Sequence, residues 1–121
     1  MLLMEKFIAG SDDDMPIGAS VVAGFDDNKD FVVEFEFNDY ENPKRDYLIR
    51  ATIEMDEARE MAGRMEKSVL DLPDLLQQNF PKEPKTLPGI SDMEKTFQEI
   101  LDFLLDNGAH YTLKRAKSFA V

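Results

Sequence analysis

Apolar residues recur at every second position in three segments of the first half of the chain. The clearest alternation runs through residues 31–38, where one face carries Phe31, Val33, Phe35 and Phe37. Residues 47–54 and 19–25 alternate in the same way. A period of two is that of a β-strand, because successive side chains point to opposite faces. The pattern therefore predicts three half-buried strands that form an antiparallel meander.

The register of these strands follows from the requirement that one face keeps its apolar residues together. Two apolar pairs define this register, Phe25 with Phe31 and Phe37 with Tyr47. It then implies three further pairs, which are Val21 with Phe35, Phe35 with Ile49, and Glu34 with Arg50. A cross-strand pair of opposite charge contributes at most about 1 kcal/mol, so the last pair agrees with the register without proving it.

The second half of the chain has the period of an α-helix. Apolar residues spaced by three and four positions predict helices over 57–70, 73–80 and 92–107. Asp56 is expected to cap the first helix, and Ser91 to open the third as part of a capping box. Asn107-Gly108 is expected to end the third helix, since glycine is favoured just after a helix C-terminus.

A sheet with one apolar face and helices with one apolar stripe each exclude water together when the helices pack on that face. The sequence therefore predicts a single α+β domain over 1–121, a two-layer fold with a meander of three to four strands and two to three helices on one sheet face. A fourth strand over 110–115 is favoured over a trailing basic tail. Residues 81–90 are expected to form a Pro-rich connector. The order of residues 1–18 is left open, partial disorder included.

The charge of the chain is acidic and unevenly placed. The 25 Asp and Glu against 14 Lys and Arg give a formal net charge of −11. The first 60 residues carry 16 acidic and 6 basic side chains, whereas residues 110–121 contain Lys114, Arg115 and Lys117 and no acid. A negatively charged protein is repelled by polyphosphate backbones. We therefore expect no nucleic-acid partner, and favour either another protein with a basic surface or a second copy of this chain.

Patterns for membrane insertion and export are missing from the sequence. No apolar stretch approaches the roughly 20 residues of a membrane-spanning helix, and the start of the chain lacks the basic and apolar regions of a signal peptide. The expectation is a cytoplasmic protein with no membrane partner.

The sequence offers few of the patterns that are typical of catalytic, cofactor-binding or metal-binding sites. The chain has no Cys and one His, which excludes disulfides and thiolate metal sites. A calcium loop starting at Asp26 fails, because its sixth position is Phe31 and its twelfth is Phe37. The glycines form no phosphate-binding loop and the serines no nucleophile elbow. No catalytic, cofactor-binding or metal residue is assigned, and no cofactor is expected.

The favoured hypothesis is a non-catalytic protein-interaction domain: an inhibitor, immunity or accessory factor, or a self-associating protein. Its candidate contact surface is the outer sheet face, where apolar residues are expected in water with charged residues around them. The residues of this predicted surface are Val22, Val32, Glu34, Glu36, Leu48 and Arg50.

Two other hypotheses stay open. A nucleic-acid-mimicking inhibitor of a DNA-binding protein needs a row of carboxylates, for which the sequence offers Glu34, Glu36, Asp39 and Glu41. A carboxylate- or metal-dependent small enzyme needs a concave site that gathers at least three of the residues Asp12, Asp13, Asp14, Asp26, Asp30 and His110.

Overall fold

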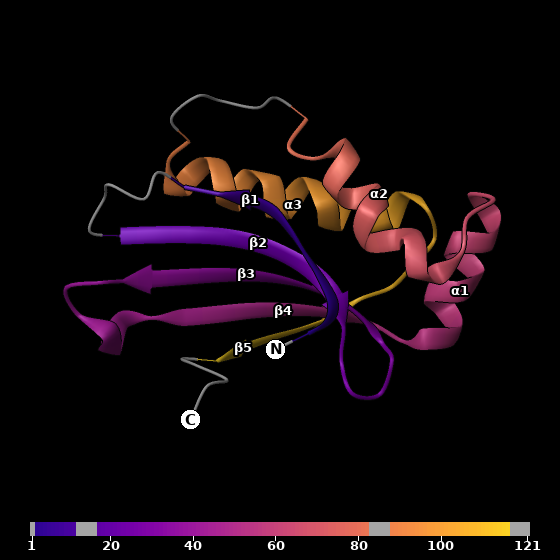
Figure 1. Cartoon of the computed structure of the whole chain (residues 1–121), viewed down its shortest axis with the longest axis horizontal. Helices are drawn as coiled ribbons and strands as arrows, with labels where there is room; N and C mark the ends of the chain where they lie inside the picture. The colour runs from indigo at the N-terminus through magenta and orange to yellow at the C-terminus, as the bar shows by residue number, and fades with distance from the viewer. Residues whose placement is uncertain (1, 12–16, 83–87, 117–121) are drawn as a thin grey trace.

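The sheet is antiparallel and five-stranded in a computed structural model of the chain, which describes residues 2–11, 17–82 and 88–116. Its strands are β1 (Leu3–Gly10), β2 (Ile17–Phe25), β3 (Phe31–Asp39), β4 (Tyr47–Ile53) and β5 (Thr112–Ala116). The strands lie side by side in chain order (Figure 1). The helices are α1 (Met55–Arg64), α2 (Leu72–Asn79) and α3 (Ile90–Asp106), and the short 3-10 turns are η1 (Pro43–Arg45) and η2 (Val69–Asp71).

The pairing of the three central strands is the one that the alternation predicts. Phe25 lies opposite Phe31, and Phe37 lies opposite Tyr47. The implied pairs are also present: Val21 with Phe35, Phe35 with Ile49, and Glu34 with Arg50. The predicted strand over 110–115 is present as β5, paired with β4.

The predicted count of three to four strands is wrong, because β1 adds a strand at one edge. The alternation of β1 is broken by two shifts in its pairing with β2, one between Leu3 and Lys6 and one between Phe7 and Ala9. A bulge inserts an extra residue and reverses the phase of the side chains that follow it. A period-two pattern therefore cannot reveal this strand.

Parts of two other expectations lie outside the described residues. Residues 12–16 belong to the segment whose order the sequence leaves open; of the rest of that segment, 3–10 form β1 and 17–18 begin β2. Residues 83–87 form the middle of the predicted connector.

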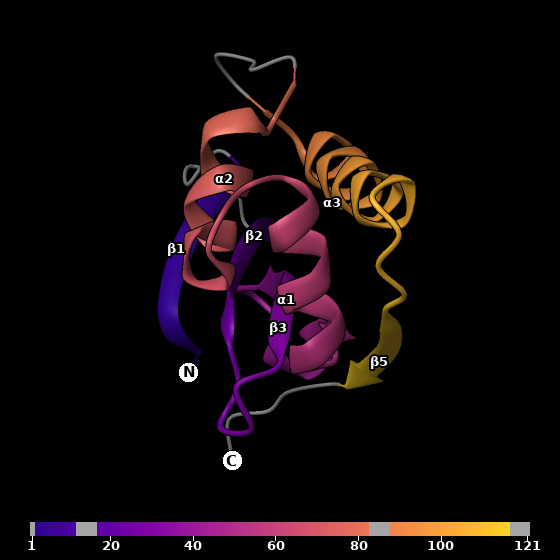
Figure 2. The same cartoon turned by 90° about the vertical axis from the view of Figure 1, so that its right-hand side faces the viewer.

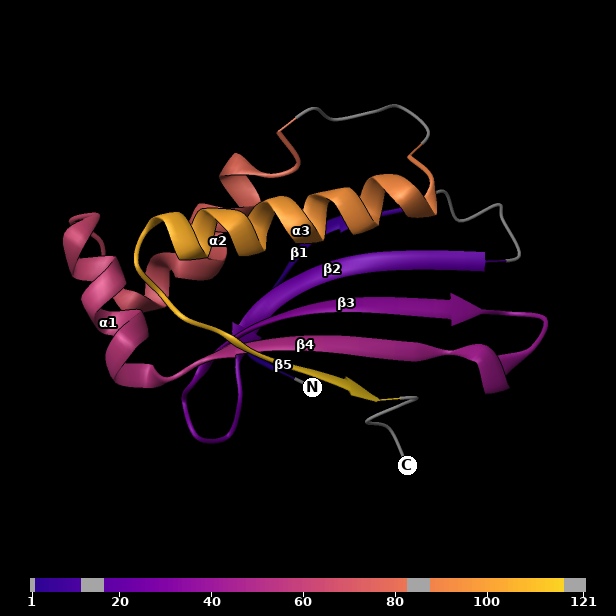
Figure 3. The ribbon, with the colours of Figure 1, turned by 180° about the vertical axis from the view of Figure 1, so that it is seen from behind.

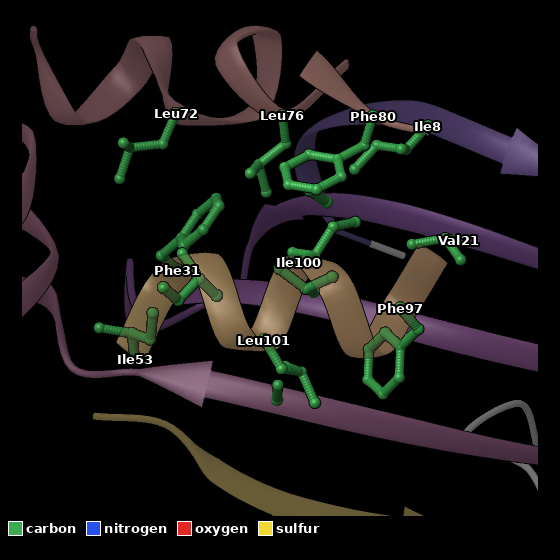
Figure 4. Close-up of a cluster of buried hydrophobic side chains, with 14 of the residues drawn as sticks. Ile8, Val21, Phe31, Ile53, Leu72, Leu76, Phe80, Phe97, Ile100 and Leu101 are labelled. Carbon is green, nitrogen blue, oxygen red and sulfur yellow. The ribbon is translucent and has the colours of Figure 1, made fainter. Parts of the chain in front are cut away.

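The core lies between the sheet and the helices, which confirms the predicted two-layer α+β fold (Figure 2). α2 packs on β1, and α3 packs across β2 and β3. The rings of Phe35 on β3 and Phe97 on α3 join the two layers, with their centroids 5.8 Å apart. Figure 4 labels ten of the core side chains, which are Ile8, Val21, Phe31, Ile53, Leu72, Leu76, Phe80, Phe97, Ile100 and Leu101.

α1 starts before the predicted boundary and has a different cap. Asp56, the expected cap, lies in the first turn of the helix. The N–H of Met55 instead donates to Oδ1 of Asp30 at 3.0 Å, from the hairpin that joins β2 and β3. A cap supplied from another part of the fold cannot be recognised in a local sequence pattern.

The single helix predicted over 57–70 is divided in two. After Arg64 the chain turns at Glu66, whose φ of 59° is left-handed. Ser68 then caps η2, with its Oγ accepting the N–H of Leu70 at 3.3 Å. A non-glycine residue in the left-handed region is uncommon, so the composition of this segment gives little warning of the break.

The ends of α3 agree with the prediction at one side only. Gly89 rather than Ser91 is the N-cap, and Oδ2 of Asp92 accepts the N–H of Gly89 at 2.9 Å. At the other end Gly108 has a φ of 83°, as expected for the predicted Asn107-Gly108 stop.

Two glycines give a matched test of this helix geometry. Gly63→Ala is expected to raise the free energy of unfolding by about 0.5–1 kcal/mol, because Gly disfavours a helix interior and an added Cβ meets nothing within 4 Å. Gly108→Ala is expected to lower it by about 1–2 kcal/mol, because an L-residue is strained there. Urea unfolding followed by circular dichroism measures both changes. Changes of the same sign contradict the placement of Gly63 in a helix interior and of Gly108 in the left-handed region.

Candidate functional site on the outer face of the sheet

The residues predicted to contact a partner share the sheet face that points away from the helices. They are Val22, Val32, Glu34, Glu36, Leu48 and Arg50. Their exposure differs: Val32, Glu34 and Leu48 are 0%, 7% and 9% exposed, and Glu36 is open to solvent. The structure therefore brings the six together on one face and covers three of them.

Glu34 and Arg50 form the ion pair that the register predicts. Nε of Arg50 donates to Oε2 of Glu34 at 2.6 Å, and Nη2 of Arg50 lies 2.5 Å from the same oxygen. A carboxylate removed from water is costly unless it is paired and hydrogen-bonded. Arg50 meets that requirement for Glu34, so the charge of Glu34 is compensated within the domain.

A hollow lies on the same face, over β1, β2 and the end of β3. The side chains of Phe7 and Tyr40 both line it, together with Ser20 and Asn38, and its volume is ≈ 310 Å³. Phe7 is 58% exposed and Tyr40 is 63% exposed. Two aromatic rings this open at one hollow make it a candidate contact surface, since aromatic side chains supply much of the binding energy at interfaces.

Two glycines form the backbone beneath these rings. A Cβ on Gly10 would lie 2.6 Å from Cζ of Phe7, and a Cβ on Gly18 would lie 2.9 Å from Oη of Tyr40. Non-bonded carbon atoms normally stay about 3.5–4.0 Å apart. The rings therefore occupy the space of the missing side chains, and a larger residue at either glycine displaces a ring.

Glu36 places a negative charge beside the hollow. Ser20, which lines the hollow, lies directly opposite Glu36 across β2 and β3, and such partners have Cβ atoms about 4.5–5.5 Å apart. Within the described part of the chain, Glu36 forms no ion pair. We call the hollow with Phe7, Tyr40 and Glu36 the aromatic–carboxylate site.

Two of the acidic residues considered for metal binding, Asp26 and Asp30, accept backbone hydrogen bonds within the fold. Oδ1 of Asp26 accepts the N–H groups of Asn28 and Asp30 at 2.9 and 3.0 Å, and Asp30 also holds α1 as described above. Among the residues that the structure describes, no three His, Cys, Asp or Glu side chains are grouped for a metal ion. Residues 12–14 lie outside that description.

The carboxylate row considered for nucleic-acid mimicry is interrupted. Glu34 is held by Arg50, and Asp39 is 6% exposed and accepts two backbone N–H groups of its own loop. Glu36 and Glu41 are the exposed members of the row. Two separated carboxylates do not reproduce the regular charge spacing of a phosphate backbone.

The single histidine pairs with α1. Oε1 of Glu57 accepts the backbone N–H of His110 at 2.6 Å and lies 2.8 Å from its Nδ1. These hydrogen bonds from His110 hold the pKa of the Glu57 carboxyl below its usual value. The contact fixes the segment that leads into β5 against α1.

The sequence patterns selected Glu36 but not the two aromatic residues of the aromatic–carboxylate site. Phe7 and Gly10 belong to the strand whose alternation is broken, and Tyr40 follows the end of β3. The contact of Tyr40 with Gly18 joins the residue after β3 to β2, so it becomes visible only when the register is known. A signal that survives in the sequence is the short spacing between Phe7 and Gly10.

Comparison of the chain with protein-family models, with curated proteins and with solved structures finds no match. None of the helices in the described residues is long and apolar enough to cross a membrane. The geometry described above therefore carries the functional argument.

Replacing one member of the Glu34 and Arg50 pair tests its structural role. Arg50→Met is expected to lower the free energy of unfolding by about 2 kcal/mol, because it leaves Glu34 without its charged partner. The double variant Glu34→Met/Arg50→Met is expected to be less destabilised than Arg50→Met. Urea unfolding of the three proteins measures this, and a double variant that is the least stable contradicts it.

The contact between Glu57 and His110 predicts a pH dependence. Because the pKa of Glu57 is lowered by folding, its contribution to stability is complete above the unfolded pKa of about 4.3 and is lost as the pH falls through the folded value. The native protein is expected to have a higher Tm than Glu57→Gln at about pH 6, and this difference is expected to vanish at about pH 2. Calorimetry at both pH values measures it, and a difference that grows on acidification is the opposite result.

Proposed function

We propose that this protein is a non-catalytic interaction domain that binds a basic segment of another protein at the aromatic–carboxylate site. One observation supports the proposal above the others: the rings of Phe7 and Tyr40 line one hollow, and beside it lies the exposed carboxylate of Glu36, which forms no ion pair with any residue that the structure describes. Two aromatic faces and a carboxylate suit the side chain of Lys or Arg, whose cation is attracted by both.

The expected affinity of one basic side chain is low. A cation over an exposed aromatic ring contributes about 0.5–1 kcal/mol, and an exposed ion pair contributes up to about 1 kcal/mol. A dissociation constant of about 1 mM corresponds to a binding free energy of about −4 kcal/mol, so a segment with several basic residues is needed for tighter binding. The net charge of −11 supports such a partner, because it raises the rate of encounter with a positively charged protein.

A peptide titration tests the proposal directly. The probe is a short capped peptide of alternating Arg and Gly, and its matched control has Gln in place of Arg. The Arg peptide is expected to shift backbone amide signals in nuclear magnetic resonance spectra at the hollow, around Phe7, Ser20, Asn38 and Tyr40. The Gln peptide is expected to leave these signals in place, and added NaCl is expected to weaken the binding of the Arg peptide.

Variants separate the site from the overall charge. Phe7→Ala, Glu36→Gln and Gly18→Ala are each expected to weaken binding of the Arg peptide at least about threefold, which corresponds to a loss of about 0.6 kcal/mol. Gly18→Ala keeps Tyr40 but displaces its ring, so it tests the geometry. Glu60→Gln on α1 removes the same charge elsewhere and is expected to have little effect.

Two results contradict the proposed site. One is a pattern of shifts spread over all acidic surfaces with none concentrated at the hollow. The other is an equal loss of affinity in Glu36→Gln and Glu60→Gln, which assigns binding to net charge alone.

A further inference from the structure

The two edges of the sheet differ in how they are finished. β1 is irregular, with two shifts in its pairing. Its edge is also covered from α2, where Nε2 of Gln77 donates to the carbonyl oxygen of Phe7 at 2.8 Å and Asp74 lies 3.4 Å from Nζ of Lys6. Bulges and covering side chains of this kind prevent a sheet edge from pairing with another strand.

β5 forms the opposite edge, and among the described residues neither a shift in its pairing nor a covering side chain is found there. Its pairing with β4 runs without a shift from Leu48 with Ala116 to Thr52 with Thr112. No other strand in the described residues pairs with its free side, which lies at the border of the sheet (Figure 3). β5 contains neither proline nor an acidic residue. Lys114 and Arg115 are the edge protection that remains, so the backbone of β5 is open to a further strand that keeps these two cations apart from others.

The side chains of β5 also leave apolar surface uncovered. Leu113 lies opposite Ala51, on the same sheet face as the core, yet it is 50% exposed. Two positions further along this face, the guanidinium carbon of Arg115 lies 4.4 Å from the centre of the Tyr47 ring. Tyr111, two positions before Leu113, is half-buried against the core.

We propose that β5 pairs with β5 of a second copy of this chain, antiparallel and with a two-fold axis at Leu113. Each Leu113 then lies beside Leu113 of the partner subunit. Arg115 lies opposite the partner subunit's Tyr111, and Lys114 opposite the partner subunit's Thr112. Both copies keep their helices on the same side of one continuous sheet, because directly opposed residues of paired strands point to the same face.

Charge favours this register. β5 carries the cations Lys114 and Arg115, and residues 109–116 carry no acidic side chain, so a second copy pairs stably only where these cations are kept apart. Pairing centred on Leu113 covers two exposed leucine side chains and sets Arg115 against an aromatic ring, whereas pairing centred on Lys114 sets two Lys side chains opposite each other. Like charges directly opposed across strands are destabilising. The second copy is thus a self-complementary partner for β5.

The oligomeric state in solution is the first test. Sedimentation equilibrium of the native protein is expected to give a monomer–dimer equilibrium, and Leu113→Lys is expected to shift it to monomer. Leu70→Lys replaces an equally exposed leucine outside the sheet and is expected to keep the dimer. Circular dichroism confirms that both variants fold. A native protein that stays monomeric at about 1 mM, or a Leu113→Lys variant that dimerises like the native protein, overturns the proposal.

The absence of cysteine allows a clean test of the register. A disulfide needs Cα atoms about 4.4–6.8 Å apart, and directly opposed residues of antiparallel strands are about 4.5–5.5 Å apart. Mild oxidation is expected to convert Leu113→Cys to a covalent dimer several times faster than Leu70→Cys. Equal rates for the two variants overturn the register.

The dimer and the proposed basic partner can fail independently. Two copies of the same acidic chain repel each other, so added NaCl is expected to strengthen the dimer, whereas it weakens binding of the Arg peptide. Phe7→Ala is expected to keep the dimer, and Leu113→Lys is expected to keep peptide binding. A dimer lost with Phe7→Ala and retained with Leu113→Lys places self-association at the hollow and overturns pairing through β5.

Discussion

The pairing of β3 with its two neighbours is the constraint on which the rest of the structure depends. β3 places Phe31, Val33 and Phe35 in the core on one face and Glu34 and Glu36 on the other. A slip of one residue would exchange the two faces, moving the carboxylates into the core and the aromatic rings into water. Isolated carboxylates in a core cost several kcal/mol each, so a single register is strongly preferred. The outer face of the sheet is thereby defined at the same time as the core.

The elements that could be predicted are those with strong local periodicity. The three central strands and their register follow from alternation, α2 agrees within one residue with the helix expected over 73–80, and Gly108 ends α3 as expected. Apart from the N-cap of α3, which is Gly89 rather than Ser91, the errors involve contacts between distant residues or unusual backbone. Bulges break the alternation of β1, and Asp30 accepts the first N–H of α1 from outside that helix. Glu66 adopts a left-handed conformation without being glycine. No local pattern reports such features.

The same limit explains why part of the predicted contact surface is buried. Alternation correctly groups residues on the outer face, but it does not say which of them other parts of the chain cover. Val32 is fully buried and Leu48 nearly so, although both occupy positions expected in water. Phe7 and Tyr40 are exposed instead, and they come from an irregular strand and a turn. Exposure on a sheet face is a property of tertiary packing, whereas the sequence pattern fixes only the face.

The unequal edges of the sheet decide what kind of self-association is physically open to the chain. Pairing of β5 with β1 of another copy would be head-to-tail and would leave a free edge at each end, which leads to filaments. The irregular, side-chain-covered edge of β1 opposes that growth, so an assembly through β5 closes at two copies. Because the aromatic–carboxylate site lies over β1, β2 and the end of β3, at the other border of the sheet from β5, pairing through β5 leaves both copies of the site open. Under the two proposals together, a partner with two basic segments would gain affinity from binding both sites at once, provided that its linker spans the joined sheets.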